Sequence, residues 1–212
     1  MSTVKTDAIE TRAGGTSVLT IGTATQTIKL PGGTPGLNKV LKSDASGNAT
    51  WGADSGGLFA SYAILADQKT SGTGGGTFTS GSWQTRDLQT AIYDGIGISF
   101  STNEFTLPAG DYLIKWYAPA WRVSGHQSRL YKATAPTGEV EVGSTAYSPA
   151  PVIHAGGNVL DWSLGAARVS EASPTAYTIE HQCQVTFAAE GYGPYLSFGT
   201  EQFTVVEVFK ES

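Results

Sequence analysis

The most informative part of the sequence is Phe105-Thr-Leu-Pro-Ala-Gly-Asp-Tyr-Leu-Ile-Lys-Trp-Tyr-Ala-Pro-Ala-Trp121. Pro108 fixes its own φ and Gly110 tolerates a positive φ, so Pro108–Gly110 is predicted to form a turn. Alternate residues of the following run share a face, with Tyr112, Ile114, Trp116 and Ala118 on one side and Leu113, Lys115 and Tyr117 on the other. One aromatic face and one mixed face predict a strand in a sheet that packs on a second sheet.

Strand-like runs continue on both sides of this stretch. They are predicted at 61–66, 77–79, 83–93, 96–100, 103–107, 128–133, 139–146, 161–171, 176–188 and 202–210. Many short strands separated by turn signals are typical of a sandwich or jelly roll. Leu88, Ala91 and Ile92 have helical spacing, but the Thr, Trp and Tyr residues around them prefer strands. The predicted fold class is all-β, with an antiparallel β-sandwich or jelly roll over this part of the chain.

Composition excludes several classes of partner. The chain has 212 residues, which favours one domain with an appendage. A net charge of −5 and the lack of a basic stripe argue against nucleic acid as a partner. The lack of a long apolar run argues against membrane insertion, and Met1–Asp7 lacks the apolar segment of an export signal. The single cysteine excludes an internal disulfide framework, so stability is expected from packing or assembly.

The turn and the aromatic strand resemble the Phe…Pro-Gly-x-Tyr turn and central strand of complement- and tumour-necrosis-factor-like jelly rolls. The longer pattern resembles heads that end bacteriophage tail fibres. It includes S-R-L-Y-K-A-T (128–134), V-G-S-T-A-Y-S (142–148), I-E-H-Q-C-Q (179–184) and F-T-V-V-E-V-F-K (203–210). The resemblance covers roughly residues 58–212 and implies a trimeric head. The fold class it implies is all-β: a short trimeric β-stalk followed by an antiparallel jelly-roll β-sandwich head.

Three segments are expected along the chain. Residues 1–15 are polar and are interpreted as a virion attachment segment, residues 16–57 as an intertwined β-stalk and linker, and residues 58–212 as the jelly-roll head. Residues 16–51 hold brief apolar pairs, such as Val18-Leu19, with too little apolar surface for a core of their own. Strands from several chains around a shared axis would bury these pairs, and 38–51 resembles stalk segments of phage fibres. The alternative is a flexible Gly/Ser/Thr linker.

No enzyme motif is found in the sequence. His181 and Cys183 are expected on one strand face, where three copies around an axis could bind zinc, but a core His and Cys is the preferred interpretation. Glu139 and Glu141 share a strand face as well, and a solvated face is preferred over a glycoside-cleaving pair. The sequence therefore predicts a non-enzymatic protein with no metal and no cofactor.

Binding residues are expected on loops at one end of the head. If the first and last strands are antiparallel neighbours, the chain enters and leaves the head beside the stalk. The connections at 67–82, 119–127, 147–160 and 189–201 then gather at the far end. The candidate receptor-binding residues are the aromatic, apolar and cationic side chains of these loops: Trp121, Arg122, His126, Tyr147, Ile153, His154, Tyr192 and Tyr195. Trp121 and Tyr192 are equally well interpreted as plugs at the end of the core.

These features favour a homotrimeric bacteriophage fibre or spike protein that binds a host cell-surface glycan or protein through the far end of its head. Its N-terminus would bind a phage tail or capsid protein. The expected location is the virion, as a tail fibre or other surface appendage made in the host cytoplasm. The alternatives are a virion structural or decoration protein with no receptor role, a surface-polysaccharide depolymerase, and a cellular cytokine-like or complement-like head.

Overall fold

Strands account for all regular secondary structure in the described part of the chain. The computed structural model describes residues 20–21, 28–29, 36–37, 39–46, 49–53, 59–150 and 158–211. The chain divides into two units, Met1–Ser55 and Gly56–Ser212. Within the described ranges, no helix is long and apolar enough to cross a bilayer.

The first unit contains two short antiparallel pairs. Strand β1 (Thr20–Ile21) pairs with β2 (Ile28–Lys29), and β3 (Lys39–Ser43) pairs with β4 (Ala49–Ala53). The Asp44 carboxylate accepts a hydrogen bond from the backbone N–H of Ser46 at 2.9 Å, in the turn between β3 and β4. Val40 and Leu41 on β3 are exposed. A two-stranded hairpin with exposed apolar side chains has little core of its own.

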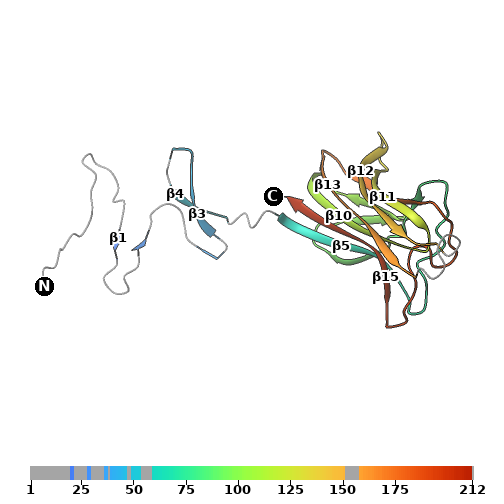
Figure 1. Ribbon diagram of the computed structural model, residues 1–212. Coiled ribbons are helices and arrows are strands. Elements are labelled where there is room, and N and C mark those ends of the chain that lie inside the picture. Colours follow the sequence, from blue (N-terminus) through green and yellow to red (C-terminus); the bar gives the residue numbers. More distant parts are fainter. Residues whose placement is uncertain are drawn as a thin grey trace. The chain divides into compact units, whose positions relative to one another are not determined.

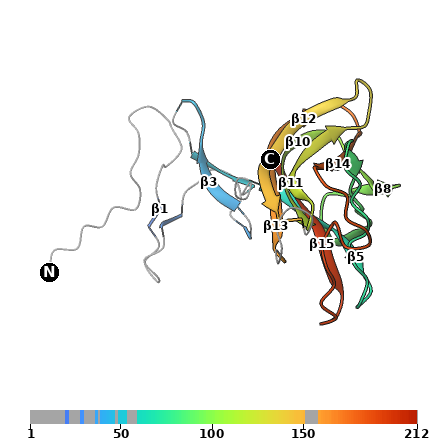
Figure 2. The ribbon, with the colours of Figure 1, turned by 45° about the vertical axis from the view of Figure 1, so that its right-hand side comes forward.

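The second unit is a sandwich of two antiparallel sheets (Figures 1 and 2). The first sheet has the order β13-β10-β15-β5-β7 and consists of β5 (Phe59–Lys69), β7 (Thr90–Asp94), β10 (Gly110–Trp121), β13 (Leu160–Glu171) and β15 (Glu201–Glu211). The second sheet has the order β12-β11-β14-β9-β8, with β6 pairing β14. It consists of β6 (Gln84–Thr85), β8 (Ser99–Ser101), β9 (Glu104–Leu107), β11 (Ser124–Lys132), β12 (Gly138–Ser148) and β14 (Thr175–Cys183). This strand order is that of a jelly roll, as predicted.

The core lies between the two sheets and is centred on β10. Tyr112, Ile114 and Trp116 are fully buried on the inner face of β10, which confirms the predicted register. The Trp116 indole N–H donates to the hydroxyl of Ser128 on β11 at 2.8 Å, so the same side chain also links the two sheets. A Cβ placed on Gly165, opposite Trp116 on β13, would lie 1.9 Å from the indole ring. The ring therefore occupies the space that the glycine leaves.

The first and last strands of the sandwich are antiparallel neighbours, as expected. Phe59 at the start of β5 pairs with Glu211 at the end of β15, and Lys69 pairs with Glu201 at the opposite end. Figure 1 shows the start of β5 beside the C-terminus. We call the end of the sandwich where β5 ends and β15 begins the loop end. The connections 70–83, 122–123 and 184–200 meet there, together with the described ends of the connection between β12 and β13, 149–150 and 158–159.

Two predicted elements are wrong in detail. The connection predicted over 119–127 is only Arg122-Val123, because β10 continues to Trp121 and β11 begins at Ser124. Arg122 and Ser124 both have a φ of 61°, a left-handed conformation that lets the chain reverse within two residues. The single strand predicted over 83–93 is instead two strands, β6 and β7, and the side chains of Arg86 and Leu88 between them are buried.

Candidate binding site at the loop end

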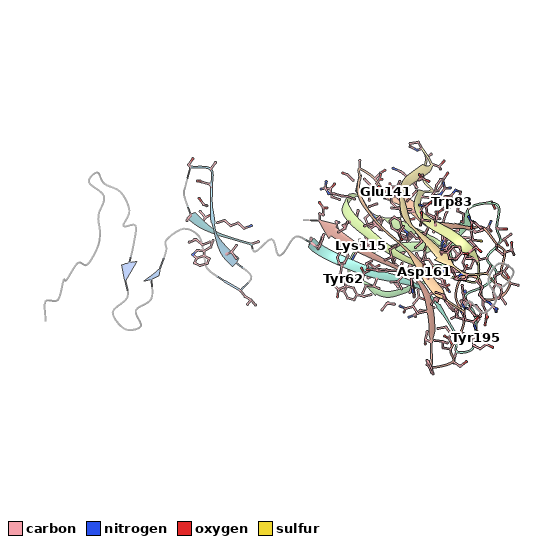
Figure 3. All side chains as sticks on the ribbon, in the orientation of Figure 1. Tyr62, Trp83, Lys115, Glu141, Asp161 and Tyr195 are labelled. Carbon is pink, nitrogen blue, oxygen red and sulfur yellow. The ribbon has the colours of Figure 1, made fainter. Side chains whose placement is uncertain are left out.

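Exposed apolar side chains gather on one segment at the loop end. Tyr195 is 46% exposed, Leu196 64% and Phe198 92%, all in the connection between β14 and β15. Figure 3 shows Tyr195 apart from Tyr62, Lys115 and Asp161, which lie along the first sheet. Tyr195 was a predicted candidate, whereas Leu196 and Phe198 were not. The run Pro194-Tyr-Leu-Ser-Phe-Gly199, apolar yet flanked by turn residues, is the sequence signal that could have identified them.

The Glu201 carboxylate holds this segment in place. It accepts hydrogen bonds from the backbone N–H groups of Ser197 at 2.7 Å, Leu196 at 3.2 Å and Gly72 at 3.1 Å. These bonds, that of Gly72 first, hold the pKa of the Glu201 carboxyl below its ordinary value. One carboxylate therefore fixes the segment 194–200 to β15 and to the connection 70–83.

Trp121 and Arg122 form a second part of the loop end. The Trp121 ring meets the Phe187 ring edge-on, with centroids 5.4 Å apart. The Arg122 guanidinium lies 5.0 Å from the Trp121 centroid and 5.1 Å from the Phe187 centroid. All three side chains are half-buried. A cation over two aromatic rings is a rigid group that can contact a ligand from the surface.

Tyr192 closes the end of the core. Its ring stacks on Phe78 at a centroid separation of 4.4 Å, and the Arg86 guanidinium lies 4.0 Å from the Tyr192 ring centroid. Arg86 is fully buried and donates to the Thr204 hydroxyl at 2.7 Å and the Pro119 carbonyl at 3.1 Å. Burial lowers the pKa of Arg86 to about 10. Of the two interpretations of Tyr192, the structure places it as a plug, half-buried against these groups.

His126 is not on a loop, and its position is the main correction among the candidate residues. It lies on β11 with its side chain turned into the core, only 3% exposed. Its Nδ1 is 3.0 Å from Nε2 of the fully buried His181. The turn at 122–123 is two residues long, which places His126 within the strand instead of in a surface connection.

The two residue pairs that were considered as possible sites lie as the preferred interpretations expect: His181 and Cys183 are buried, and Glu139 and Glu141 are exposed. Cys183 is buried beside Phe78 and Val123, and burial raises the pKa of its thiol to about 12. Among the described residues, no three His, Cys, Asp or Glu side chains group closely enough to bind a metal ion. Glu139 and Glu141 are exposed on β12, and Glu139 forms an ion pair with Arg129 at 3.2 Å.

The structure describes one of the three remaining candidates. Tyr147 lies at the loop end of β12 and is 44% exposed. Ile153 and His154 lie outside the described residues. The described candidates that share the surface of the loop end are thus Trp121, Arg122, Tyr147 and Tyr195, with Leu196 and Phe198 as additions.

A second apolar surface covers the outer face of the first sheet. Leu164, Tyr117 and Val205 form one cross-strand row over β13, β10 and β15. With Trp162 and Asp161 they line a pocket of about 510 Å³. On the same sheet the rings of Tyr62 and Tyr93 stack at 4.5 Å, and those of Phe59 and Phe209 lie 4.9 Å apart. We call this the outer apolar face; its two apolar groups lie on either side of the Lys115–Glu207 ion pair, whose charged atoms are 3.7 Å apart. Exposed apolar groups of this kind are typical of protein–protein interfaces.

No protein-family model and no curated protein matches the sequence. Solved structures with a similar fold include murine APRIL, at 8% identity and a TM-score of 0.44 over 71% of this chain and 99% of that one. The globular domain of zebrafish complement 1qA is 14% identical, with a TM-score of 0.42 over 70% of this chain and 95% of that one. The PRD1 vertex protein P5 is 11% identical, with a TM-score of 0.42 over 97% of this chain and 100% of that one. The fold class of this chain rests on its own strand order and register.

Proposed function

We propose that the chain is a non-enzymatic, homotrimeric bacteriophage fibre or spike protein that binds the host cell surface through the loop end of its head. Residues 1–15 attach it to a phage tail or capsid protein, residues 16–57 form the stalk, and residues 58–212 form the head. The phage assignment rests on the resemblance of the sequence to fibre heads and of segment 38–51 to fibre stalks. The protein is then a virion component made in the host cytoplasm.

The outer apolar face supports assembly of the head. Leu164 and Trp162 are exposed on β13 beside the half-buried Tyr117. A second copy of the chain packed on this face removes their apolar surface from water. In the first unit, exposed Val40 and Leu41 likewise need partner strands. Both units thus lack burial that other copies can supply, which supports a trimer built along the whole chain.

The observation that supports recognition at the loop end is the exposed segment Tyr195–Phe198, which the Glu201 carboxylate holds in place. Three backbone N–H groups fix its path while its apolar side chains stay in water. A rigid loop with exposed aromatic side chains loses little conformational entropy on binding. Three copies on a trimer present equal sites, so weak contacts to a repeated surface ligand add through avidity.

Competition with phage tests this proposal. The purified full chain is added to cells of the host strain before phage, and free phage is counted after adsorption. We expect the parent to block adsorption and the double variant Tyr195→Ala, Phe198→Ser to lose at least tenfold in blocking concentration. The matched control is Ser173→Ala, an exposed residue in the turn at the opposite end of the sandwich. If the parent protein does not block adsorption, the result favours a decoration protein. If the double variant blocks adsorption as well as the parent does, the binding surface lies away from the loop end.

A further inference from the structure

A polar pocket lies on the outer face of the second sheet, beside the loop end. It has a volume of about 310 Å³ and is lined by residues of β11, β12, β14 and the position after β14: Gly125, His126, Gln127, Thr145, Gln182, Cys183 and Gln184. His126 and Cys183 turn their side chains into the core and contact His181 and Phe78 there, so they form the floor. The walls are the remaining polar side chains.

Gly125 lies in the wall of the pocket, and the Gln184 side chain covers it: a Cβ on Gly125 would lie 2.9 Å from that side chain. Gly125 pairs with Tyr147 on β12, and its carbonyl accepts a hydrogen bond from the Gln184 N–H at 2.9 Å. In the next row of the same face, Gln127 pairs with Thr145 and with Gln182. Neighbouring side chains on one face of a sheet stand close together, so the residues of these two rows line one pocket.

Two of the wall amides are held by the backbone. The Gln127 Nε2 donates to the Gly143 carbonyl at 2.9 Å, and the Gln184 Oε1 accepts from the Gly125 N–H at 3.1 Å. Each amide has two donor hydrogens and two acceptor lone pairs, so each keeps hydrogen-bonding capacity for a ligand. Amides that are already oriented lose less entropy when a ligand binds.

The chemistry of the walls selects the ligand. Three amides and one hydroxyl offer both donors and acceptors, and none of the lining side chains carries a fixed charge. A ligand that matches this set is neutral and rich in hydroxyl groups. Pockets for small ligands span about 300–1,000 Å³, so this one is suited to a single ring of a longer chain. Tyr147, 44% exposed beside Gly125, offers an aromatic surface at the rim.

We infer that this pocket is a binding subsite for a neutral saccharide unit, separate from the apolar segment at the loop end. The inference rests on the proposed function, since it names a chemical class that the head recognises on the host surface. A trimer carries three such pockets, each contacting one unit of a repeated polymer. The loop end and the pocket then contact different parts of the same surface.

Direct binding to sugars provides the test. The full chain is screened against neutral hexose, deoxyhexose and N-acetylhexosamine oligosaccharides, with uronic-acid oligosaccharides as the charged comparison. Saturation-transfer NMR reports the contact, and titration of the best neutral oligosaccharide gives its Kd. We expect binding of at least one neutral oligosaccharide, with the uronic acids bound at least tenfold more weakly. The inference is wrong if no neutral oligosaccharide binds, or if the uronic-acid oligosaccharides bind as tightly as the neutral ones.

Gly125→Ala is the decisive variant. A Cβ at Gly125 would lie 2.9 Å from the flexible end of the Gln184 side chain, so the added methyl group displaces that amide from the wall of the pocket. We expect a Kd at least tenfold higher, with an unchanged melting temperature. Gly138→Ala is the matched control, because a Cβ there meets no atom within 4 Å. Gln182→Ala is a second test that adds no atoms, with an expected loss of at least threefold. Unchanged sugar binding in both pocket variants would place the saccharide elsewhere.

Competition assays separate this inference from the proposed function. Lipid-linked and wall-linked glycan fractions of the host envelope are compared as competitors of the bound oligosaccharide, which identifies the source of the saccharide. If neither fraction displaces the bound oligosaccharide, the pocket has no part in host recognition. A chain that blocks phage adsorption but binds no sugar refutes the saccharide site alone. A chain that binds sugar but blocks no phage refutes the receptor role alone.

Discussion

Trp116 is the residue on which the sandwich depends most. It is fully buried, lies over Gly165 and hydrogen-bonds to Ser128 on the facing sheet. We expect Trp116→Ala to lower the free energy of unfolding by about 3–5 kcal/mol per subunit, since it leaves a large cavity. Urea denaturation measures this loss. The control is Trp116→Phe, which keeps an aromatic ring and removes the hydrogen bond, and its loss should be clearly smaller. Equal losses would mean that the hydrogen bond, not the packing, dominates.

The buried histidines make stability depend on pH. Burial, reinforced by the nearby Arg86 cation and opposed by Asp161, lowers the pKa of His126 to about 4, and burial and Arg86 hold that of His181 well below its ordinary value. An unfolded histidine titrates near about 6.5, so below that pH the unfolded chain binds more protons than the folded one. The histidine contribution is therefore complete above about pH 6.5 and is lost as the pH falls toward 4.

Melting temperatures of parent and His126→Leu between pH 7.5 and 4 test this dependence. The variant starts lower at neutral pH, because His181 Nε2 loses its partner, but its melting temperature should fall less steeply between pH 6.5 and 4. Carboxylates titrate in both proteins, so the difference between the two curves isolates the histidine. Parallel curves would contradict the buried, neutral state of His126.

At the scale of elements, the segment 194–200 depends on one carboxylate. Glu201→Ala removes the acceptor of the Gly72, Leu196 and Ser197 N–H groups. We expect faster hydrogen exchange at these three amides while the amides of β10 stay protected. The variant should also block phage less well, since its apolar loop is no longer fixed. Glu139→Ala serves as the control, because Glu139 is exposed on β12 and makes only a surface ion pair with Arg129. Unchanged exchange in Glu201→Ala would show that the segment is held by other contacts.

The sequence predicts the strands far better than their connections, and β10 and β11 show why. The alternation of Tyr112, Ile114 and Trp116 reflects burial on one face, which the residue types themselves encode. The turn after β10 relies on left-handed Arg122 and Ser124, residues that carry no glycine signal, so it could not be recognised. His126 was misplaced as a direct result. Arg86 was unpredictable for a similar reason, because its hydrogen-bond partners come from distant segments.

The candidate site was predicted only in part, since exposure depends on neighbours that the sequence does not show. Tyr192 and Tyr195 are three residues apart in one loop. Tyr192 is covered by Phe78 and Arg86, whereas Tyr195 stays in water. The saccharide pocket shows the same limit. Its lining residues are far apart in the sequence, and only the pairing of β11 with β12 and β14 brings them together.

For the whole molecule, assembly through the outer apolar face is the prediction with the widest consequence. Leu164 is 47% exposed on β13, the edge strand of this face, next to Tyr117. We expect sedimentation of the parent to show a trimer at micromolar concentration. Leu164→Glu should dissociate the head or weaken its assembly at least tenfold, because a charge in an apolar interface is left without a partner. The change is on the surface of the isolated sandwich, so each subunit should still fold.

Val142→Glu is the control for this variant, since Val142 is exposed to a similar extent, 41%, on the second sheet. It should sediment as the parent does. Loss of assembly in Leu164→Glu should also reduce the blocking of phage adsorption, because single heads lack avidity. Sugar binding at the Gly125 pocket should persist in those single heads, since that pocket lies within one sandwich. A parent that sediments as a monomer would leave the outer apolar face without the partner proposed for it. A trimer unaffected by Leu164→Glu would place the contacts between copies elsewhere, the short strands β1–β4 being the next candidates.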